Sequence, residues 1–210
     1  MLHDKQLVIV LYHIGFFYNY FIYDYIMLPI IIGYIGGYLI SHHLYHFYFS
    51  HKTYEDNTAT KIFSIICVLF NGWATSPIEY SISHRQHHAF SDIEGDPHNP
   101  QILSFWKIFF MQYSKVNYKK SLMKDILKSK FQRQLRKYKL KIHLLFAFIC
   151  FVIDPLIFLL IICPINVYWV WYIAFINYFG HKNGSPYNSK LLLLVGPWAW
   201  KHKDHHERIL

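Results

Sequence analysis

Histidines are the side chains of this chain whose spacing could carry chemistry. The 210 residues include 15 histidines, and six of them form two triplets with the same H-x-x-H-H spacing. These are His84, His87 and His88 in SHRQHHAF, and His202, His205 and His206 in KHKDHHER. Positions i, i+3 and i+4 share one face of a helix, so each triplet can direct its imidazoles toward one point. The spacing therefore predicts two sets of metal ligands.

A third group of histidines precedes the triplets. It lies in SHHLYHFYFSHKTY and comprises His42, His43, His46 and His51. His42 and His46 are i, i+4 partners, whereas His46 and His51 diverge by about 140 degrees on an ideal α-helix. We therefore expect His46 and His51 to converge only if the helix ends or bends between them, near Ser50. The spacing alone leaves both pairings open.

Imidazole is a usual ligand for iron, zinc or copper, and this many nitrogen donors exceed the needs of one ion. Two ions are implied. Asn177 and His181, an i, i+4 pair, lie near the same set. No thiolate site is expected, because the three cysteines lie singly in apolar runs. For His3, His13 and His143 we favour the alternative, that they are hydrogen-bonded structural residues.

Long apolar segments must position these histidines. Apolar residues make up 54% of the chain and charged residues 16%, against roughly 25% charged in soluble domains. This composition excludes disorder. Four apolar stretches approach the roughly 20 residues that cross a bilayer, and they predict spans at about 7–23, 26–47, 143–163 and 165–180. Helices buried in a soluble domain would show a polar face. The first stretch lacks a small-residue cleavage site, so we expect a retained span.

The segment 50–142 is predicted to lie outside the membrane or in its interface, as is the tail 181–210. Within this segment, 62–78 is apolar, but a crossing there would separate the histidine groups onto opposite sides. Its central Asn71, Gly72 and Trp73 suit an interfacial or re-entrant segment better.

Positive charge is concentrated in one loop. The chain carries 21 Lys and Arg against 12 Asp and Glu, a formal charge of +9. Residues 115–141 hold 11 of the basic residues and a single acid, Asp125. The positive-inside tendency makes this loop cytoplasmic, and with it both termini and the histidines. The loop could also attract lipid phosphates or an acidic protein. Nucleic acid is not expected as a partner of a chain anchored by four helices.

The order of these motifs resembles a known family. The segment HFYFSHKTY, then PIEY and HRQHHAFSDIEGDPHN, then KHKDHH resemble the histidine boxes of the membrane-bound fatty acid desaturases. The second box is similar to that of the acyl-CoA or acyl-lipid delta-9 desaturases. The resemblance covers nearly the whole chain, from the second span to His206, and it favours His46 and His51 over His42 and His43 in the first box.

The resemblance implies an all-α integral membrane protein of one domain, residues 1–210, in which four transmembrane helices carry a cytosolic di-iron cap. It also implies nine histidine ligands to two irons: His46, His51, His84, His87, His88, His181, His202, His205 and His206. Asn177 matches an asparagine that contacts a metal through water, whereas His98 in DPHN is not expected to be a ligand. No catalytic residue is implied beyond the metal centre.

Desaturation must break two unactivated C–H bonds, which requires iron and dioxygen because no side chain can do it. The histidines would then be a scaffold, oriented by nearby carboxylates. The candidates are Glu79, Asp92, Glu94, Asp96, Asp204 and Glu207. Substrate-lining candidates are Trp73, Tyr80 and Trp106, and Lys115 and Lys119 could meet the phosphates of CoA or of a lipid headgroup.

The implied partners are the bilayer, a fatty acyl-CoA or acyl-lipid, and an external electron donor. Cytochrome b5 or ferredoxin, with its reductase, would dock on the basic face. The expected location is the endoplasmic reticulum of a eukaryotic host or the cytoplasmic membrane of a bacterium. Two alternatives remain: a di-iron lipid hydroxylase of the same superfamily, and a membrane protein that binds or transports metal. Transporters place ligands near the bilayer midplane, whereas these histidines cluster at one edge.

Overall fold

The computed structural model describes residues 2–23 and 27–208 of the chain. The predicted start of the second span, at residue 26, lies outside them, and so does the side chain of His3. The described chain is almost entirely helical. Its long helices are α1 (Leu2–Tyr23), α2 (Met27–Tyr38), α3 (Thr58–Asn71), α4 (Pro77–Ala89), α7 (Lys130–Ile153) and α9 (Cys163–Phe179).

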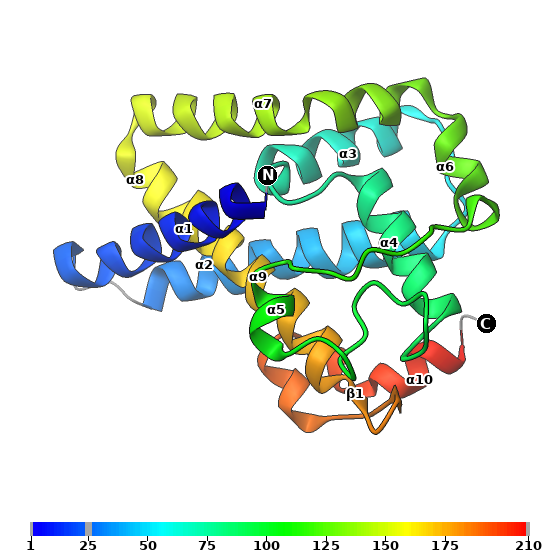
Figure 1. The fold of residues 1–210 in the computed structure, drawn as a ribbon. Coiled ribbons are helices and arrows are strands. Elements are labelled where there is room, and N and C mark those ends of the chain that lie inside the picture. Colours follow the sequence, from blue (N-terminus) through cyan, green and yellow to red (C-terminus); the bar gives the residue numbers. More distant parts are fainter. Residues whose placement is uncertain (1, 24–26, 209–210) are drawn as a thin grey trace.

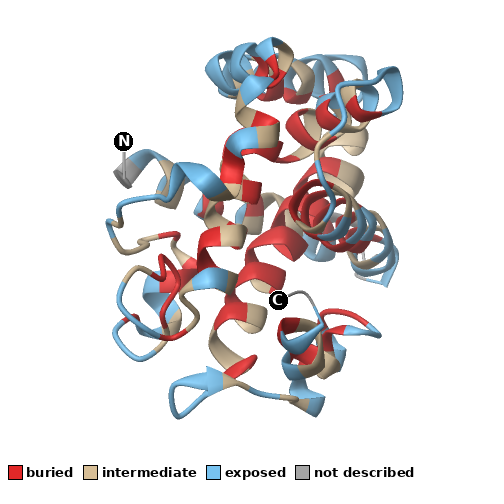
Figure 2. Cartoon of the chain, turned by 90° about the vertical axis from the view of Figure 1, so that its right-hand side faces the viewer, coloured by how far each residue is buried: buried red, intermediate tan, exposed pale blue. Residues whose placement is uncertain are grey.

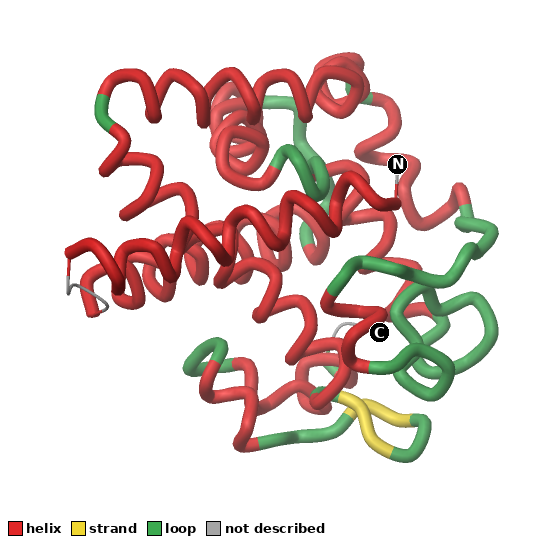
Figure 3. The backbone as a smooth tube through the Cα atoms, turned by 60° about the vertical axis from the view of Figure 1, so that its left-hand side comes forward, coloured by secondary structure: helices red, strands yellow, loops and turns green. Residues whose placement is uncertain are grey.

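Shorter elements complete the fold. Two are π-helices that extend a neighbour, η1 (Leu39–His51) after α2 and η3 (Phe158–Ile162) before α9. The others are α5 (Phe105–Phe109), η2 (Lys120–Met123), α6 (Lys124–Lys128), α8 (Pro155–Ile157), η4 (Lys190–Leu194), η5 (Ala199–Lys201) and α10 (His202–Glu207). Strands β1 (His181–Lys182) and β2 (Ser185–Pro186) form a small antiparallel hairpin. Figure 3 shows this hairpin and most of the loops at one end of the molecule.

Helix α9 lies at the centre and packs against α1, α2 and α5, while α7 packs on α3 and α4 on η1 (Figure 1). Buried residues accordingly occupy the middle of the molecule (Figure 2). The contact between α2 and α9 is close because α2 presents glycines. A Cβ on Gly33 would lie 2.8 Å from the Pro164 carbonyl oxygen, and one on Gly37 would overlap the Tyr168 ring. Any larger residue at either position would push the two helices apart.

Two helical runs of the described chain are long and apolar enough to cross a membrane, Met27–His51 and Pro155–Phe179. The four spans expected from the sequence are therefore not all shown. Polar residues such as His13 and Asn19 interrupt α1, and lysines and arginines occupy the first half of α7. Helix α3 has 14 residues, fewer than the roughly 20 that a crossing needs.

The boundary of the third predicted span also differs. Residues 143–163 do not form one helix, because α7 ends at Ile153 and a new helix begins at Pro155. The Asp154 carboxylate accepts a hydrogen bond from the Leu156 N–H at 2.9 Å, and proline is favoured at the first helical position. Residues 155–163 thus belong to the last long helix.

Apolar side chains remain exposed on the outer faces of several helices. They include Leu7, Leu11, Ile14 and Phe21 of α1, Met27, Ile31 and Ile35 of α2, and Leu144, Phe148 and Val152 of α7. Exposed apolar surface of this extent is typical of contact with lipid. Together with the two long apolar helices, it indicates that the protein associates with a membrane.

Candidate metal centre

The first histidine box lies on the π-helix η1. The sequence predicted an end or a bend between His46 and His51, and the structure shows neither, because η1 continues through His51. In a π-helix each N–H bonds to the carbonyl five residues earlier, so residues five apart lie on the same side. The two imidazoles therefore converge, and their Nε2 atoms lie 3.2 Å apart.

The second box lies on the last turns of α4. This helix starts at Ser76, whose N–H donates to the Glu79 carboxylate at 3.0 Å while Pro77 fills the first position. His84 and His88 are four residues apart on one face of α4, and their ring centres lie 4.5 Å apart. The His87 ring lies instead beside His181, His202 and His206.

The third box forms α10, which packs against the end of α9. Gly180 makes this approach possible, because a Cβ there would lie 2.5 Å from Cδ2 of His202. His181 follows directly and is buried beside His202, with their Nε2 atoms 3.0 Å apart.

The nine histidines expected from the resemblance come together as two groups. The first group contains His46, His51, His84, His88 and His205; the second group contains His87, His181, His202 and His206. Within each group the candidate ligand nitrogens all lie within 4.8 Å of one another. The two groups touch where the rings of His88 and His206 stack at 4.0 Å.

Two carboxylates fix the orientation of ring nitrogens in the second group. His181 Nδ1 lies 2.7 Å from Asp92 Oδ2, and His87 Nδ1 lies 2.9 Å from Asp96 Oδ1. Because Nδ1 donates, Nε2 of each ring carries a lone pair. Both carboxylates were among the sequence candidates. The others hold no imidazole: Glu79 pairs with Lys139, Asp204 with Asn188 and Glu207 with Lys203, and Glu94 is exposed.

These nitrogens fit metal ions better than hydrogen bonds among themselves. His87 Nε2 and His206 Nε2 are buried without a hydrogen-bond partner in the described part of the chain. Burial lowers the pKa of His205 to about 4 and that of His206 to about 2, so both are neutral at pH 7. Neutral imidazoles whose lone pairs face one another need a cation between them. The two groups are therefore compatible with metal binding.

An ion pair that no sequence motif predicted holds the first box against the second. Arg85, between two ligand candidates on α4, pairs with Asp125 at 2.7 Å. Its guanidinium also donates to the carbonyls of Ser50 at 2.8 Å and Lys52 at 2.9 Å, on either side of His51. Arg85 thereby fixes the end of η1 against α4.

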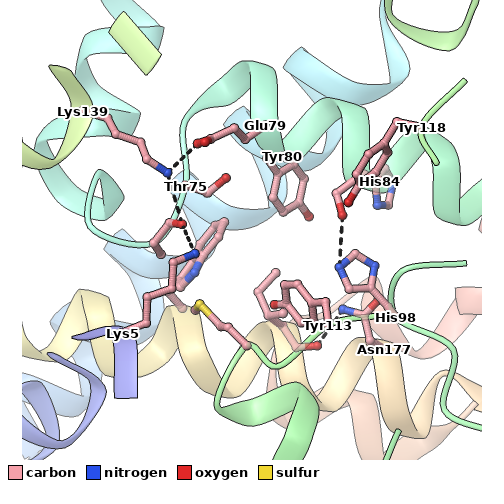
Figure 4. Close-up of a pocket in the computed structure, with 15 residues that line it drawn as sticks. Lys5, Thr75, Glu79, Tyr80, His84, His98, Tyr113, Tyr118, Lys139 and Asn177 are labelled. Carbon is pink, nitrogen blue, oxygen red and sulfur yellow. Dashed lines mark hydrogen bonds and ion pairs between the residues drawn. The ribbon is translucent and has the colours of Figure 1, made fainter. Parts of the chain in front are cut away.

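A cavity of about 190 Å³ runs from the second box toward the start of α1 (Figure 4). His84, His98 and Asn177 lie at one end, and Lys5, Lys139 and Glu79 at the other. Tyr80, Met111, Tyr113 and Trp169 are among the residues between them. Lys5 donates to the Ala74 carbonyl at 2.8 Å, and burial lowers the pKa of its ammonium group.

Of the residues expected to line a substrate site, Tyr80 lies on this cavity. Trp73 does not, since it is buried and donates its Nε1–H to Asn166 Oδ1. Trp106 is 59% exposed on α5. Lys115 and Lys119 are exposed and are not among the residues that line the cavity. The two lysines that do line it, Lys5 and Lys139, were not singled out from the sequence.

Asn177 lines the cavity beside the histidines, and its amide group donates to the Ile173 carbonyl at 2.8 Å. Its contact with a metal through water stays a prediction. His98 is buried near His87 and Asp96, and these three could form a further metal group. Asp96 instead accepts the His98 backbone N–H at 2.8 Å and the His87 ring nitrogen, which makes this a hydrogen-bonded cluster.

Comparison with known proteins agrees with this arrangement. The profile of the fatty acid desaturase family matches residues 19–209. A relative, the acyl-CoA Delta(11) desaturase of Choristoneura rosaceana, is 29% identical over 120 residues, which are 53% of this chain. The match covers 34% of that relative's length, less than two thirds of it. A mainly helical fold that gathers nine histidines into two groups, and a family match over most of the chain, define its class. The chain belongs to the fatty acid desaturase family.

Proposed function

We propose that this chain is an oxygen-dependent fatty acyl desaturase of the delta-9 type, which introduces a cis double bond into an acyl chain carried by CoA or by a lipid. The observation that carries the proposal is the pair of histidine groups, one of five mostly half-buried histidines and one of four buried histidines. In the proposal the nine histidines hold two irons, and Asn177 contacts one of them through water.

Removal of two hydrogens from adjacent CH2 groups supplies two electrons and two protons. Dioxygen accepts these with two more electrons and two protons from outside, and leaves as two waters. The bound irons supply the oxidising chemistry that side chains lack. The chain's own part is to hold neutral imidazoles in place, to bind the acyl chain and to exclude water from the reacting carbons.

The cavity supports a place for the acyl chain. His84 belongs to the first group and also lines the cavity, so the reacting carbons would lie at this end. Tyr80 and Trp169 supply apolar walls. The opposite end of the cavity carries two lysines, Lys5 and Lys139, and one carboxylate, Glu79. This excess of positive charge suits the polar end of the substrate. Lys115 and Lys119 are then free to meet a larger headgroup or a protein partner.

The proposed topology has four spans with the histidines and both termini in the cytoplasm. The exposed apolar faces of α1 and of the second half of α7 support their joining the two long apolar helices in the bilayer. The turn between α7 and α8, at the left of Figure 1, lies away from α4 and α10, the helices of the second and third boxes. The basic segment 115–141 would lie on the cytoplasmic face.

Expression in a desaturase-deficient host, followed by fatty-acid profiling, tests the reaction. We expect a new monoene, two mass units lighter than its precursor, whose double-bond position defines the regiochemistry. A product that instead gains one oxygen would replace desaturation by hydroxylation. Unchanged fatty acids from an expressed chain that binds metal would contradict both reactions.

The electron donor is proposed to be an acidic protein, cytochrome b5 or ferredoxin, that docks on the basic face. Long-range attraction between opposite charges is screened by salt. Reduction of the metals by the donor should therefore slow steeply between low and high ionic strength. A rate that does not depend on salt would contradict docking through charge.

A further inference from the structure

The two histidine groups differ in the charge that surrounds them. Asp92 and Asp96 each hold Nδ1 of a histidine in the second group, His181 and His87 respectively. Both carboxylate side chains are 0% exposed. An ion in the second group would therefore lie one imidazole away from each of two buried negative charges.

The first group has no such partners. None of its five histidines bonds to a carboxylate within the described ranges, and Nδ1 of His46 is buried without a hydrogen-bond partner there. The charged side chain beside this group, Arg85, is neutralised by Asp125. The surroundings of the first group therefore carry no net negative charge to offset a cation.

The loop that carries both aspartates is fixed around the second group. Asp96 accepts the backbone N–H of Asp92 at 3.0 Å and that of His98 at 2.8 Å, which closes the loop on itself. Asp92 has φ +63° and Gly95 φ +102°, left-handed conformations that few residues adopt. The segment FSDIEGDPHN thus acts as a rigid holder for two carboxylates.

From this asymmetry we infer that the second group is the stronger metal site and fills first, because Asp92 and Asp96 raise the basicity of two of its ligands. The inference rests on the proposed two-metal centre. A carboxylate that accepts the outer N–H of a ligating imidazole orients the ring and strengthens its lone pair. Loss of such a partner typically lowers metal affinity 10- to 100-fold.

Asp92→Asn in the full-length chain tests the inference. Asparagine tolerates φ above zero, and its Oδ1 can still accept the His181 N–H, so the variant removes the charge and keeps the shape. Oδ1 of Asp92 is buried without a partner in the described structure, so an amide nitrogen in its place breaks no hydrogen bond. The matched control is Glu94→Gln, which removes a charge from an exposed position of the same loop.

Metal-free protein in detergent would be titrated with Co²⁺ and followed by visible absorption. We expect two binding steps in the wild type, the tighter of which weakens about 10-fold or more in Asp92→Asn, with two ions still bound at saturation. Glu94→Gln should leave both steps unchanged. Far-ultraviolet circular dichroism and thermal unfolding would show that both variants are folded.

Two ligand variants assign the weakened step to a group. In a His202→Ala background, which lacks a second-group ligand, Asp92→Asn should have no effect on the remaining step, which belongs to the first group. In a His46→Ala background, Asp92→Asn should weaken the remaining step, which belongs to the second group. Equal weakening of both steps by Asp92→Asn, no weakening, or the same effect from Glu94→Gln would each overturn the inference.

The proposed function is judged separately by the fatty-acid profile of the same wild-type chain. A wild type that makes a monoene and binds two Co²⁺ ions with equal affinity overturns the inference and leaves the function standing. A wild type that binds fewer than two ions overturns both the inference and the two-metal centre.

Discussion

Two kinds of buried or half-buried histidine occur in this molecule, and they differ in what their ring nitrogens meet. His143, between α7 and its neighbours, has Nδ1 at 2.8 Å from the Leu69 carbonyl oxygen and Nε2 against the Tyr12 hydroxyl. His13 is bonded to the Ile9 carbonyl and to the Trp171 indole N–H. Both nitrogens of these rings are satisfied by the protein.

The nine histidines of the two groups are different. Their Nε2 atoms either meet other imidazole nitrogens or, as in His87 and His206, meet no partner among the described residues. Burial without a partner is unfavourable by about 1–3 kcal/mol for each polar atom. The difference teaches that burial alone does not single out a candidate ligand, whereas a ring nitrogen that faces other imidazoles does.

The largest expected effect comes from His87→Ala. This change removes a ligand of the second group and the partner of Asp96, so turnover should fall below detection and bound iron should decrease. Fatty-acid profiling and metal analysis of the same preparation measure both. Retention of full activity would contradict the assignment of His87.

Arg85→Met should have the second-largest effect, because it removes the contacts that hold the first box against the second. It leaves Asp125 and the Ser50 carbonyl without their partner, at a cost of about 2–4 kcal/mol in the free energy of unfolding. We expect reduced metal in the first group together with a lower melting temperature. Arg133→Ala, which removes an exposed arginine, is the control and should change neither. Normal metal content in folded Arg85→Met would show that Arg85 does not position His51.

His143→Leu should lower stability and spare the metals. The Tyr12 hydroxyl loses its acceptor in a buried place, which should destabilise the chain by about 1–3 kcal/mol. His43→Ala, at an exposed position, is the matched control. Thermal unfolding measures the stability and metal analysis measures the metal content. Loss of metal at unchanged stability would contradict the distinction between the two kinds of histidine.

The smallest effect is on the pH dependence of the metal-free chain. Burial lowers the pKa of His205 to about 4 and that of His206 to about 2, below the ordinary histidine value of 6.5. The unfolded chain therefore binds more protons as the pH falls through 6.5, and stability must decrease from there toward pH 4. Melting temperatures of metal-free protein between pH 7.5 and 5 should fall. A constant or rising melting temperature would contradict these lowered pKa values.

Much of the candidate centre could be predicted because it depends on local spacing. The H-x-x-H-H triplets lie on helices α4 and α10, and the i, i+4 spacing brings His84 to His88 and His202 to His206. The expectation that all three imidazoles of a triplet meet at one point was wrong, because His87 and His205, at the i+3 positions, each join the other group. The family was predicted from the same motifs and is confirmed by the match over residues 19–209.

Other features depend on contacts that local patterns do not encode. Apolar periodicity does not distinguish an α-helix from a π-helix, so the route by which His46 meets His51 was missed. The end of α7 was placed too late, because apolar residues continue on both sides of Asp154. Lys5 reaches the cavity through contact with Ala74, 69 residues away in the chain, and no spacing rule predicts such a pairing.

The iron content of the purified, active chain tests the two-metal centre most directly. We expect about two iron ions per chain in the wild type, and about one in His46→Ala and in His202→Ala, since each variant lacks a ligand of one group only. Inductively coupled plasma mass spectrometry, with protein quantified by amino-acid analysis, gives the ratio. A wild-type chain that forms the double bond with one iron ion or none would contradict the assignment of the nine histidines to two ions.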